Sequence, residues 1–310
     1  MTSPAYGVLL DALRGVRWPA RRAVGAALPG AHRSRQRGTS GEFTEYRLYR
    51  QGDDPRLLDW KLLGRSDRAF VRLTDDRALL PTWFVVDASA SMNFPMFDTL
   101  PSDRHTKWSM ACALAVGLAA VATASGDPVG LIVAGRDGPF RLAARTRRGT
   151  VGEFARLLDR TVVGAETLLA PLLTTLPPMA RVVVISDLLG DCDALLRTAS
   201  QRTVAGGIVE CVHVVASEEL ALPHGTHLAR DPETPGLSRA MDHRAQVEYR
   251  TRFDAFRADC ASRWRATGAG YVEVVSHMPV PRMVRQIASG SGRGSTGDDR
   301  SRERSMQERR

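Results

Sequence analysis

The feature that most constrains the fold is a set of four short segments that are apolar along nearly their whole length. A strand that is apolar on both faces is covered on both faces, as in a parallel sheet flanked by helices. The four segments are residues 82–86, 129–134, 181–186 and 208–215. The sequence therefore predicts an α/β fold built on a doubly wound, mostly parallel sheet of the Rossmann-like kind.

The stretches between and after these strands have the spacing of helices. The longest apolar run, residues 110–124, is shorter than the ~20 residues that a membrane-spanning helix needs. We therefore expect a helix buried against the sheet and no transmembrane segment. The expected helices are residues 106–123, 151–159, 168–176, 193–203, 242–267 and 280–287, and two further strands are expected at 140–144 and 271–275.

Basic residues outnumber acidic residues by 43 to 34, but the surplus lies at the two ends of the chain. Residues 1–40 contain seven Arg and one Asp, and residues 289–310 contain six Arg and four acidic residues. A nucleic-acid-binding domain would be expected to carry a basic face with stacking aromatic side chains on its folded body. Aromatic residues make up 6% of this chain and are scattered, so we expect no nucleic-acid partner.

Composition and pattern divide the chain into four parts. Residues 1–40 form a basic N-terminal segment, 41–80 an extension, 81–288 the α/β domain, and 289–310 a Gly-, Ser- and Arg-rich tail that is expected to be disordered. The N-terminal segment carries a short apolar stripe at helical spacing, followed by Arg17 and Trp18. Packing on the body is favoured because the stripe is short, and peripheral contact with an anionic membrane is the alternative.

The extension at residues 41–80 mixes charged and aromatic side chains instead of separating them onto two faces. Residues 68–73 alternate as a strand does. A mixture of this kind can be an active site or a polar region that orders the extension on the core. The second interpretation is favoured because no His or Cys nucleophile lies among these residues. We expect residues 41–72 to pack on the core, because their aromatic side chains need burial and their charges can pair. Exposure of both Trp60 and Phe70 would contradict this expectation.

The cysteines indicate the redox state of the compartment and do not predict a metal site. Cys112, Cys192, Cys211 and Cys260 stand far apart in the sequence and have no metal-ligand spacing, and no signal peptide opens the chain. We therefore expect a reducing, cytoplasmic location. The many Arg and Ala residues, with only two lysines, are typical of a GC-rich bacterial genome.

The first apolar strand ends in the sequence D-A-S-A-S-M, which places Asp87, Ser89 and Ser91 on one tight loop. Ligands of open parallel sheets bind at the carboxyl ends of the strands. A carboxylate and two hydroxyls at alternate positions provide the oxygen ligands that Mg²⁺ or Mn²⁺ prefers. The loop therefore predicts a magnesium-type metal site, although both serines can also serve only as loop-capping residues.

Two later positions can complete the metal shell. Thr167 precedes an expected helix, and Asp187 follows the apolar strand at 181–186 directly. The two carboxylates would balance the charge of the ion, and one coordination position would remain open for water or an incoming carboxylate. The alternative for Thr167 is a simple helix N-cap.

The same residues carry a resemblance to known proteins. D-A-S-A-S-M after an apolar strand resembles the metal-ion-dependent adhesion site (MIDAS) of von Willebrand factor A domains, in which Thr167 and Asp187 would match the second and third ligand loops. Three further segments, H-R-S-R-Q-R-G, E-F-T-E-Y-R-L-Y-R-Q-G-D-D-P-R-L-L-D-W-K and R-A-F-V-R-L, resemble the bacterial family named domain of unknown function 58 (DUF58).

This resemblance implies a von Willebrand factor A-like domain that works with a MoxR-type AAA+ ATPase in chaperone-like or complex-maturation work. Some family members carry transmembrane helices before this region, and the sequence given has none. We expect a non-enzymatic, metal-dependent protein-interaction module. The alternative is a magnesium-dependent hydrolase or phosphatase-like enzyme that uses the same loop. Phosphatases of the haloacid dehalogenase type need a second Asp where this chain has Ser89, and no nucleotide-binding glycine motif is present.

Overall fold

The computed structural model describes residues 6–18, 43–50, 58–66, 68–74, 80–96, 105–164, 168–223, 225–234 and 236–290. The chain divides into two compact units. The larger comprises Met1–Ala26 with Leu80–Arg310, and the smaller comprises Ala27–Leu79. Thr167, most of the basic segment at 1–40 and the tail beyond residue 290 lie outside the described residues.

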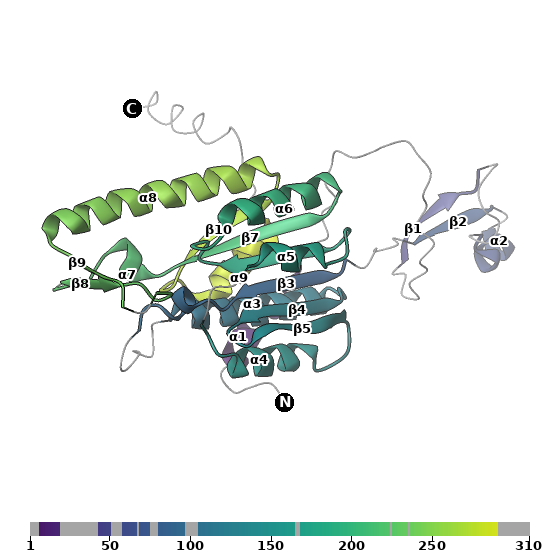
Figure 1. Cartoon of the computed structure of the whole chain (residues 1–310). Helices are drawn as coiled ribbons and strands as arrows, with labels where there is room; N and C mark the ends of the chain where they lie inside the picture. Colours follow the sequence, from purple (N-terminus) through teal and green to yellow (C-terminus); the bar gives the residue numbers. More distant parts are fainter. Residues whose placement is uncertain are drawn as a thin grey trace, which may run out of the picture. The chain divides into compact units, whose positions relative to one another are not determined.

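The larger unit is built on a six-stranded sheet with the strand order β10-β7-β6-β3-β4-β5 (Figure 1). Neighbouring strands are parallel except β4 and β5, which form an antiparallel pair at one edge. This confirms the α/β fold with a doubly wound, mostly parallel sheet. The strands are β3 (Thr82–Asp87), β4 (Val129–Gly135), β5 (Gly138–Arg145), β6 (Arg181–Ser186), β7 (Ile208–Val215) and β10 (Gly270–Val275).

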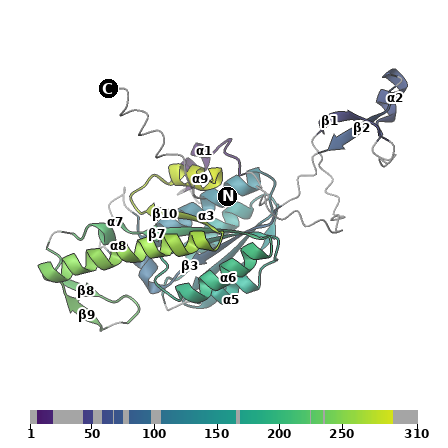
Figure 2. The ribbon, with the colours of Figure 1, turned by 90° about the horizontal axis from the view of Figure 1, so that it is seen from above.

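Helices cover both faces of the sheet, which explains why its strands are apolar on both sides (Figure 2). In β3, Phe84 and Val86 pack into one core cluster, and Trp83 and Val85 pack into the other. The first cluster is covered by α3 (Lys107–Ala124), α4 (Thr150–Arg160) and α9 (Val280–Ser289). The second is covered by α5 (Ala170–Thr174), α6 (Cys192–Val204) and α8 (His243–Ala266).

Helix α3 is the central helix of the first face and is almost entirely buried. Among the described helices it alone is long and apolar enough to cross a bilayer, by length and composition, and 72% of it is buried inside the protein. Gly117 allows it to approach its neighbours, since a Cβ there would lie 2.9 Å from Val284 of α9 and 3.1 Å from Leu13. The apolar run expected to lie against the sheet does so.

The described part of the N-terminal segment packs on the body. Helix α1 (Gly7–Ala12) is followed by Leu13 and Trp18, which are each 4% exposed and belong to the first core cluster. The backbone N–H of Trp18 donates to Ser125 Oγ at 3.1 Å, and the Arg181 guanidinium lies 4.3 Å from the centre of the Trp18 ring. For residues 6–18 the packing interpretation is therefore confirmed.

The smaller unit contains an antiparallel pair of strands, β1 (Phe43–Leu48) and β2 (Phe70–Thr74), with helix α2 (Trp60–Ser66) between them in the sequence. The Asp59 carboxylate accepts the N–H groups of Lys61 and Leu62 at the start of α2. Val71 is buried and Phe70 partly buried, but Trp60 is 65% exposed, so the expectation that Trp60 is buried is wrong. The packing of residues 41–80 on the larger unit stays a prediction.

Three short elements between β7 and α8 were not expected from the sequence. Helix α7 (Ser217–Leu220) follows β7 directly, and strands β8 (Leu228–Arg230) and β9 (Ser238–Ala240) form a small hairpin. All six strand residues of this hairpin are exposed, so the strands have no alternation of buried and exposed positions. Helix α8 then begins at His243, where the Asp242 carboxylate accepts the N–H of Ala245.

Candidate metal site

The candidate site lies where the winding of the sheet changes direction. Strands β3 and β6 are neighbours, but α3 covers one face after β3 and α6 covers the other face after β6. The loops that follow two such strands run to opposite faces of the sheet, which opens a crevice between them. Ligands of open α/β sheets bind in this crevice. Asp87 is the last residue of β3, Ser186 is the last residue of β6, and Asp187 follows it.

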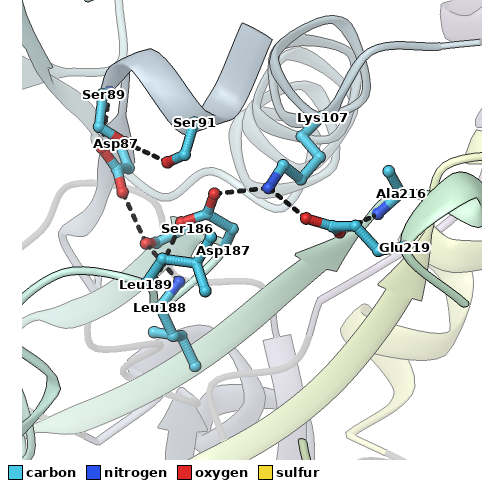
Figure 3. A network of polar contacts seen from close by, with 10 residues as sticks. All are labelled: Asp87, Ser89, Ser91, Lys107, Ser186, Asp187, Leu188, Leu189, Ala216 and Glu219. Atoms are coloured by element: carbon cyan, nitrogen blue, oxygen red, sulfur yellow. Dashed lines mark hydrogen bonds and ion pairs between the residues drawn. The ribbon is translucent and has the colours of Figure 1, made fainter. Parts of the chain in front are cut away.

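Asp87 is held by the loop that follows it and by the neighbouring strand. Its Oδ1 atom accepts the N–H of Ser89 at 2.9 Å, and its Oδ2 atom accepts the Ser186 hydroxyl at 2.7 Å (Figure 3). The hydroxyl oxygens of Ser89 and Ser91 lie 3.1 Å apart. None of these four side chains is more than 5% exposed. One carboxylate and three hydroxyls are therefore gathered beneath the surface.

The Asp87 carboxylate is buried and has a raised pKa. Burial and, secondarily, the negative charge of Asp187 raise the pKa of Asp87 to about 6, against the hydrogen bonds from Ser186 and Ser89 that lower it. Among the described residues, no Lys, Arg or His lies within ion-pair distance of Asp87. A cation placed beside this carboxylate would therefore relieve a large part of its desolvation cost.

Lys107 neutralises the second carboxylate. Its Nζ atom donates to Asp187 Oδ2 at 2.7 Å and to Glu219 Oε1 at 2.8 Å, and the lysine is 1% exposed. Burial alone would lower the pKa of Lys107, but the charges of Asp187 and Glu219 raise it above its ordinary value. The side chain is a buried ammonium ion held between two carboxylates (Figure 3).

Glu219 links Lys107 to the segment that follows a third strand, β7. It lies on α7, which follows β7, and its Oε2 atom accepts the N–H of Ala216 at 2.7 Å. The ends of β3, β6 and β7 therefore contribute Asp87, Asp187 and Glu219, and α3 contributes Lys107. Three carboxylates against one ammonium leave a formal charge of two negative units, which a divalent cation would balance.

The residues fit a hard divalent cation. Carboxylate and hydroxyl oxygens are the ligands that Mg²⁺ prefers, and Asp87, Ser89 and Ser91 present them side by side. In the part of the chain that the structure describes, no group of three or more His, Cys, Asp or Glu side chains is arranged to hold a metal ion. A metal at this site would therefore depend on the serine hydroxyls as well as on carboxylates.

Sequence comparison assigns the chain to a family. Residues 45–262 match the profile of a family described as "Protein of unknown function DUF58". The chain belongs to the DUF58 family. Uncharacterized proteins of Mycobacterium bovis and Mycobacterium tuberculosis are each 29% identical over 273 residues, which is 84% of this DUF58 chain and 83% of the relative.

Solved structures of similar proteins give a weaker comparison. The protein BatB of Bacteroides thetaiotaomicron has a TM-score of 0.42 at 17% identity, covering 68% of this chain and 98% of that one. The VWA domain of SpRpn10 has a TM-score of 0.38 at 11% identity, covering 71% of this chain and all of that one. An aerotolerance-related membrane protein of Bacteroides fragilis has a TM-score of 0.41 at 16% identity, covering 68% and 98%. The strand order, rather than these scores, defines the fold of this DUF58 protein.

Of the five residues predicted to form the site, the structure brings four together: Asp87, Ser89, Ser91 and Asp187. The fifth, Thr167, lies outside the described residues. Three further residues of the site, Lys107, Ser186 and Glu219, were not predicted from the sequence. Lys107 did carry a signal, since it is one of only two lysines in an arginine-rich DUF58 chain and opens an apolar helix.

Proposed function

We propose that this DUF58 protein is a non-enzymatic interaction module that uses Mg²⁺, or Mn²⁺, to bind a carboxylate of a partner protein. The observation that carries the proposal is the buried Asp87 carboxylate, which has two serine hydroxyls beside it and no basic partner among the described residues. Burying a charge without compensation is costly, so a chain that retains one at a strand end gains from a bound cation.

In this proposal Asp87, Ser89 and Ser91 are the ligands from the first loop, and Thr167 and Asp187 act from the second and third loops. The ion would supply positive charge for a carboxylate of the partner in a site shielded from water, where such a pair is stronger than at the surface. Lys107 would keep Asp187 in place, because its ammonium group donates to the Asp187 carboxylate and to the Glu219 carboxylate.

The proposed partner is a MoxR-type AAA+ ATPase, with a role in chaperone-like or complex-maturation work. Membership of the DUF58 family supports this choice, because the resemblance drawn from the sequence implies such a partnership. The nearly balanced charge of residues 41–288 gives no reason to expect nucleic acid as the partner.

The arrangement of side chains favours binding over catalysis. The hydroxyls of Ser89 and Ser91 face each other, and among the described residues no histidine that could act as a base is hydrogen-bonded to either. His213 lies on β7, the strand next to β6, and is buried. Its Nδ1 atom is hydrogen-bonded to the Tyr271 hydroxyl at 2.7 Å, and burial lowers the pKa of His213 to about 4. A magnesium-dependent hydrolase at the same loop remains the competing function, and turnover of a phosphoester would reveal it.

Metal binding is tested by isothermal titration of the purified chain with MgCl₂ and MnCl₂. We expect saturable binding that Asp87→Ala weakens by more than about tenfold, because an anchoring carboxylate is lost. Asp11→Ala is the matched control, since it removes an exposed carboxylate from α1. Equal affinity of wild type and Asp87→Ala would contradict the metal site.

Partner binding is tested by affinity capture from the native host in buffer containing either MgCl₂ or EDTA. Recovery of an AAA+ ATPase with wild type in MgCl₂, and its loss with EDTA or with Asp87→Ala, supports the proposal. Recovery that is unaffected by EDTA would contradict the metal dependence. Magnesium-dependent phosphoester hydrolysis by wild type, absent from Asp87→Ala, would favour the enzyme.

A further inference from the structure

Three of the four cysteines meet on one face of the sheet. Cys192 is the first residue of α6, Cys211 lies on β7, and Cys260 lies on α8. Cys211 and Cys260 belong to the second core cluster, and Cys192 packs against that cluster. All three are free thiols. Their positions, 19 and 49 residues apart in sequence, gave no sign that they meet.

An ion pair fixes the first turn of α6 against α8 beside two of these thiols. The Arg263 guanidinium pairs with the Asp193 carboxylate, and Asp193 follows Cys192 directly. Arg263 lies three residues after Cys260, so both residues are on the same side of α8. Arg263 also pairs with Asp259 on its own helix at 3.5 Å. The contact therefore joins the residue next to Cys192 to the turn of α8 that follows Cys260.

The two thiols differ in exposure and in acidity. Cys192 is partly exposed, whereas Cys260 is 2% exposed. Hydrogen bonding with the Cys260 thiol lowers the pKa of Cys192 against the opposing effect of burial. The charge of Arg263 lowers this pKa further, whereas the carboxylates of Asp193 and Asp259 raise it. The same interaction, together with burial, raises the pKa of Cys260 well above its ordinary value.

We propose that Cys192 and Cys260 form an oxidisable dithiol, in which Cys192 is the peroxide-reactive thiolate and Cys260 is the resolving thiol. The Cys192 sulfur attacks one oxygen of a hydroperoxide, the O–O bond breaks, and the other oxygen leaves as an alcohol or water after protonation. The Cys260 sulfur then attacks the Cys192 sulfenic acid and releases its oxygen as water. Two thiols are oxidised to one disulfide while one hydroperoxide is reduced.

This disulfide would connect α6 to α8 across the second face of the sheet. The reaction needs no metal and no partner, so it stands independently of the proposed function. Cys211 provides the internal comparison, because it is buried on β7 beside the same two thiols. Cys112 on α3 provides a matched control, because it is a buried thiol of the other core cluster.

The proposal is tested on the full chain, which is reduced, desalted and treated with a small excess of hydrogen peroxide. We expect the intact mass to fall by two hydrogens and the peptides that contain Cys192 and Cys260 to be cross-linked, both reversed by dithiothreitol. Cys112→Ser should behave as wild type. Cys192→Ser should not form the disulfide, and Cys260→Ser should give a sulfenic acid at Cys192 that dimedone traps.

Reaction rates decide the role of Cys192. Alkylation by iodoacetamide at neutral pH should modify Cys192 at least about tenfold faster than Cys112 in the folded protein. A cross-link between Cys192 and Cys211, oxidation of Cys192 without any disulfide, or no oxidation of Cys192 would each overturn the proposal. Circular dichroism of each serine variant establishes that it is folded before it is assayed.

Discussion

The Nζ atom of Lys107 lies 2.7 Å from the Oδ2 atom of Asp187, with both side chains almost fully buried. This ammonium is at the first residue of α3, where the helix dipole disfavours a cation. Its burial is therefore compensated by the carboxylates of Asp187 and Glu219 rather than by its helix. Lys107 acts as a fixed cation in the candidate site, and its removal leaves the buried Asp187 and the partly buried Glu219 without this counter-ion.

We predict that Lys107→Met lowers the free energy of unfolding by about 3 to 5 kcal/mol, because one partner of a buried ion pair is removed. Urea denaturation in EDTA measures this loss. Lys61→Met is the matched control, since it replaces the other lysine, which is exposed on α2. Adding Glu219→Gln to Lys107→Met should recover part of the loss. A double variant less stable than Lys107→Met alone would contradict this account of the charges.

A second prediction concerns the unpaired carboxylate itself. Asp87→Asn should raise the stability of the metal-free protein by an amount on the order of 1 kcal/mol, because it removes a desolvated charge beside Asp187. An amide of the same shape can still bond Ser89 and Ser186. Thermal unfolding in EDTA shows the gain. Excess MgCl₂ should then raise the melting temperature of wild type but not that of Asp87→Asn. A metal-free variant less stable than wild type would show that the charge does not strain the site.

A third prediction tests whether the N-terminal segment is needed for the packing of the folded body. Trp18→Ala should lower the free energy of unfolding by about 3 to 5 kcal/mol, because a buried ring stacked on Arg181 is lost. Val8→Ala, at a position 83% exposed on α1, should change stability little. Guanidinium denaturation compares the two variants. Equal midpoints for Trp18→Ala and wild type would show that the segment is not part of the folded body.

A fourth prediction tests the close approach of α3 to α9. Gly117→Ala should lower stability by about 1 to 3 kcal/mol, since the added methyl group would overlap Val284, a β-branched side chain with little freedom in a helix. Gly64→Ala on α2, where nothing lies within 4 Å, is the control and should cause no loss. In the double variant Gly117→Ala with Val284→Ala, the loss should be smaller than the sum of the two single losses. Full additivity, measured by urea denaturation, would rule out this contact.

Most of the fold was predictable because burial on two faces requires apolar residues at every position of a strand. The segments 181–186 and 208–215 are strands with those bounds, and the other core strands differ by one or two residues at their ends. The exposed hairpin of β8 and β9 was not predictable, since none of its side chains is buried. Trp60 was expected to be buried because it is large and apolar, but an individual aromatic side chain can remain exposed on a short helix.

By itself the sequence determined the sheet and the place of the site within it. D-A-S-A-S-M after one apolar strand and Asp187 after another were expected on the same side of the sheet, because the carboxyl ends of parallel strands lie together. The pairing of β3 with β6, which makes the two strand ends neighbours, is a property of the tertiary structure. Only the tertiary structure decided the electrostatics of that edge. Lys107 is 80 residues from Asp187 and 112 residues from Glu219 in sequence. The local sequence pattern indicates which face of a helix or strand is apolar. Ion pairing between residues that are distant in sequence depends on how the helices pack against the sheet in the folded protein.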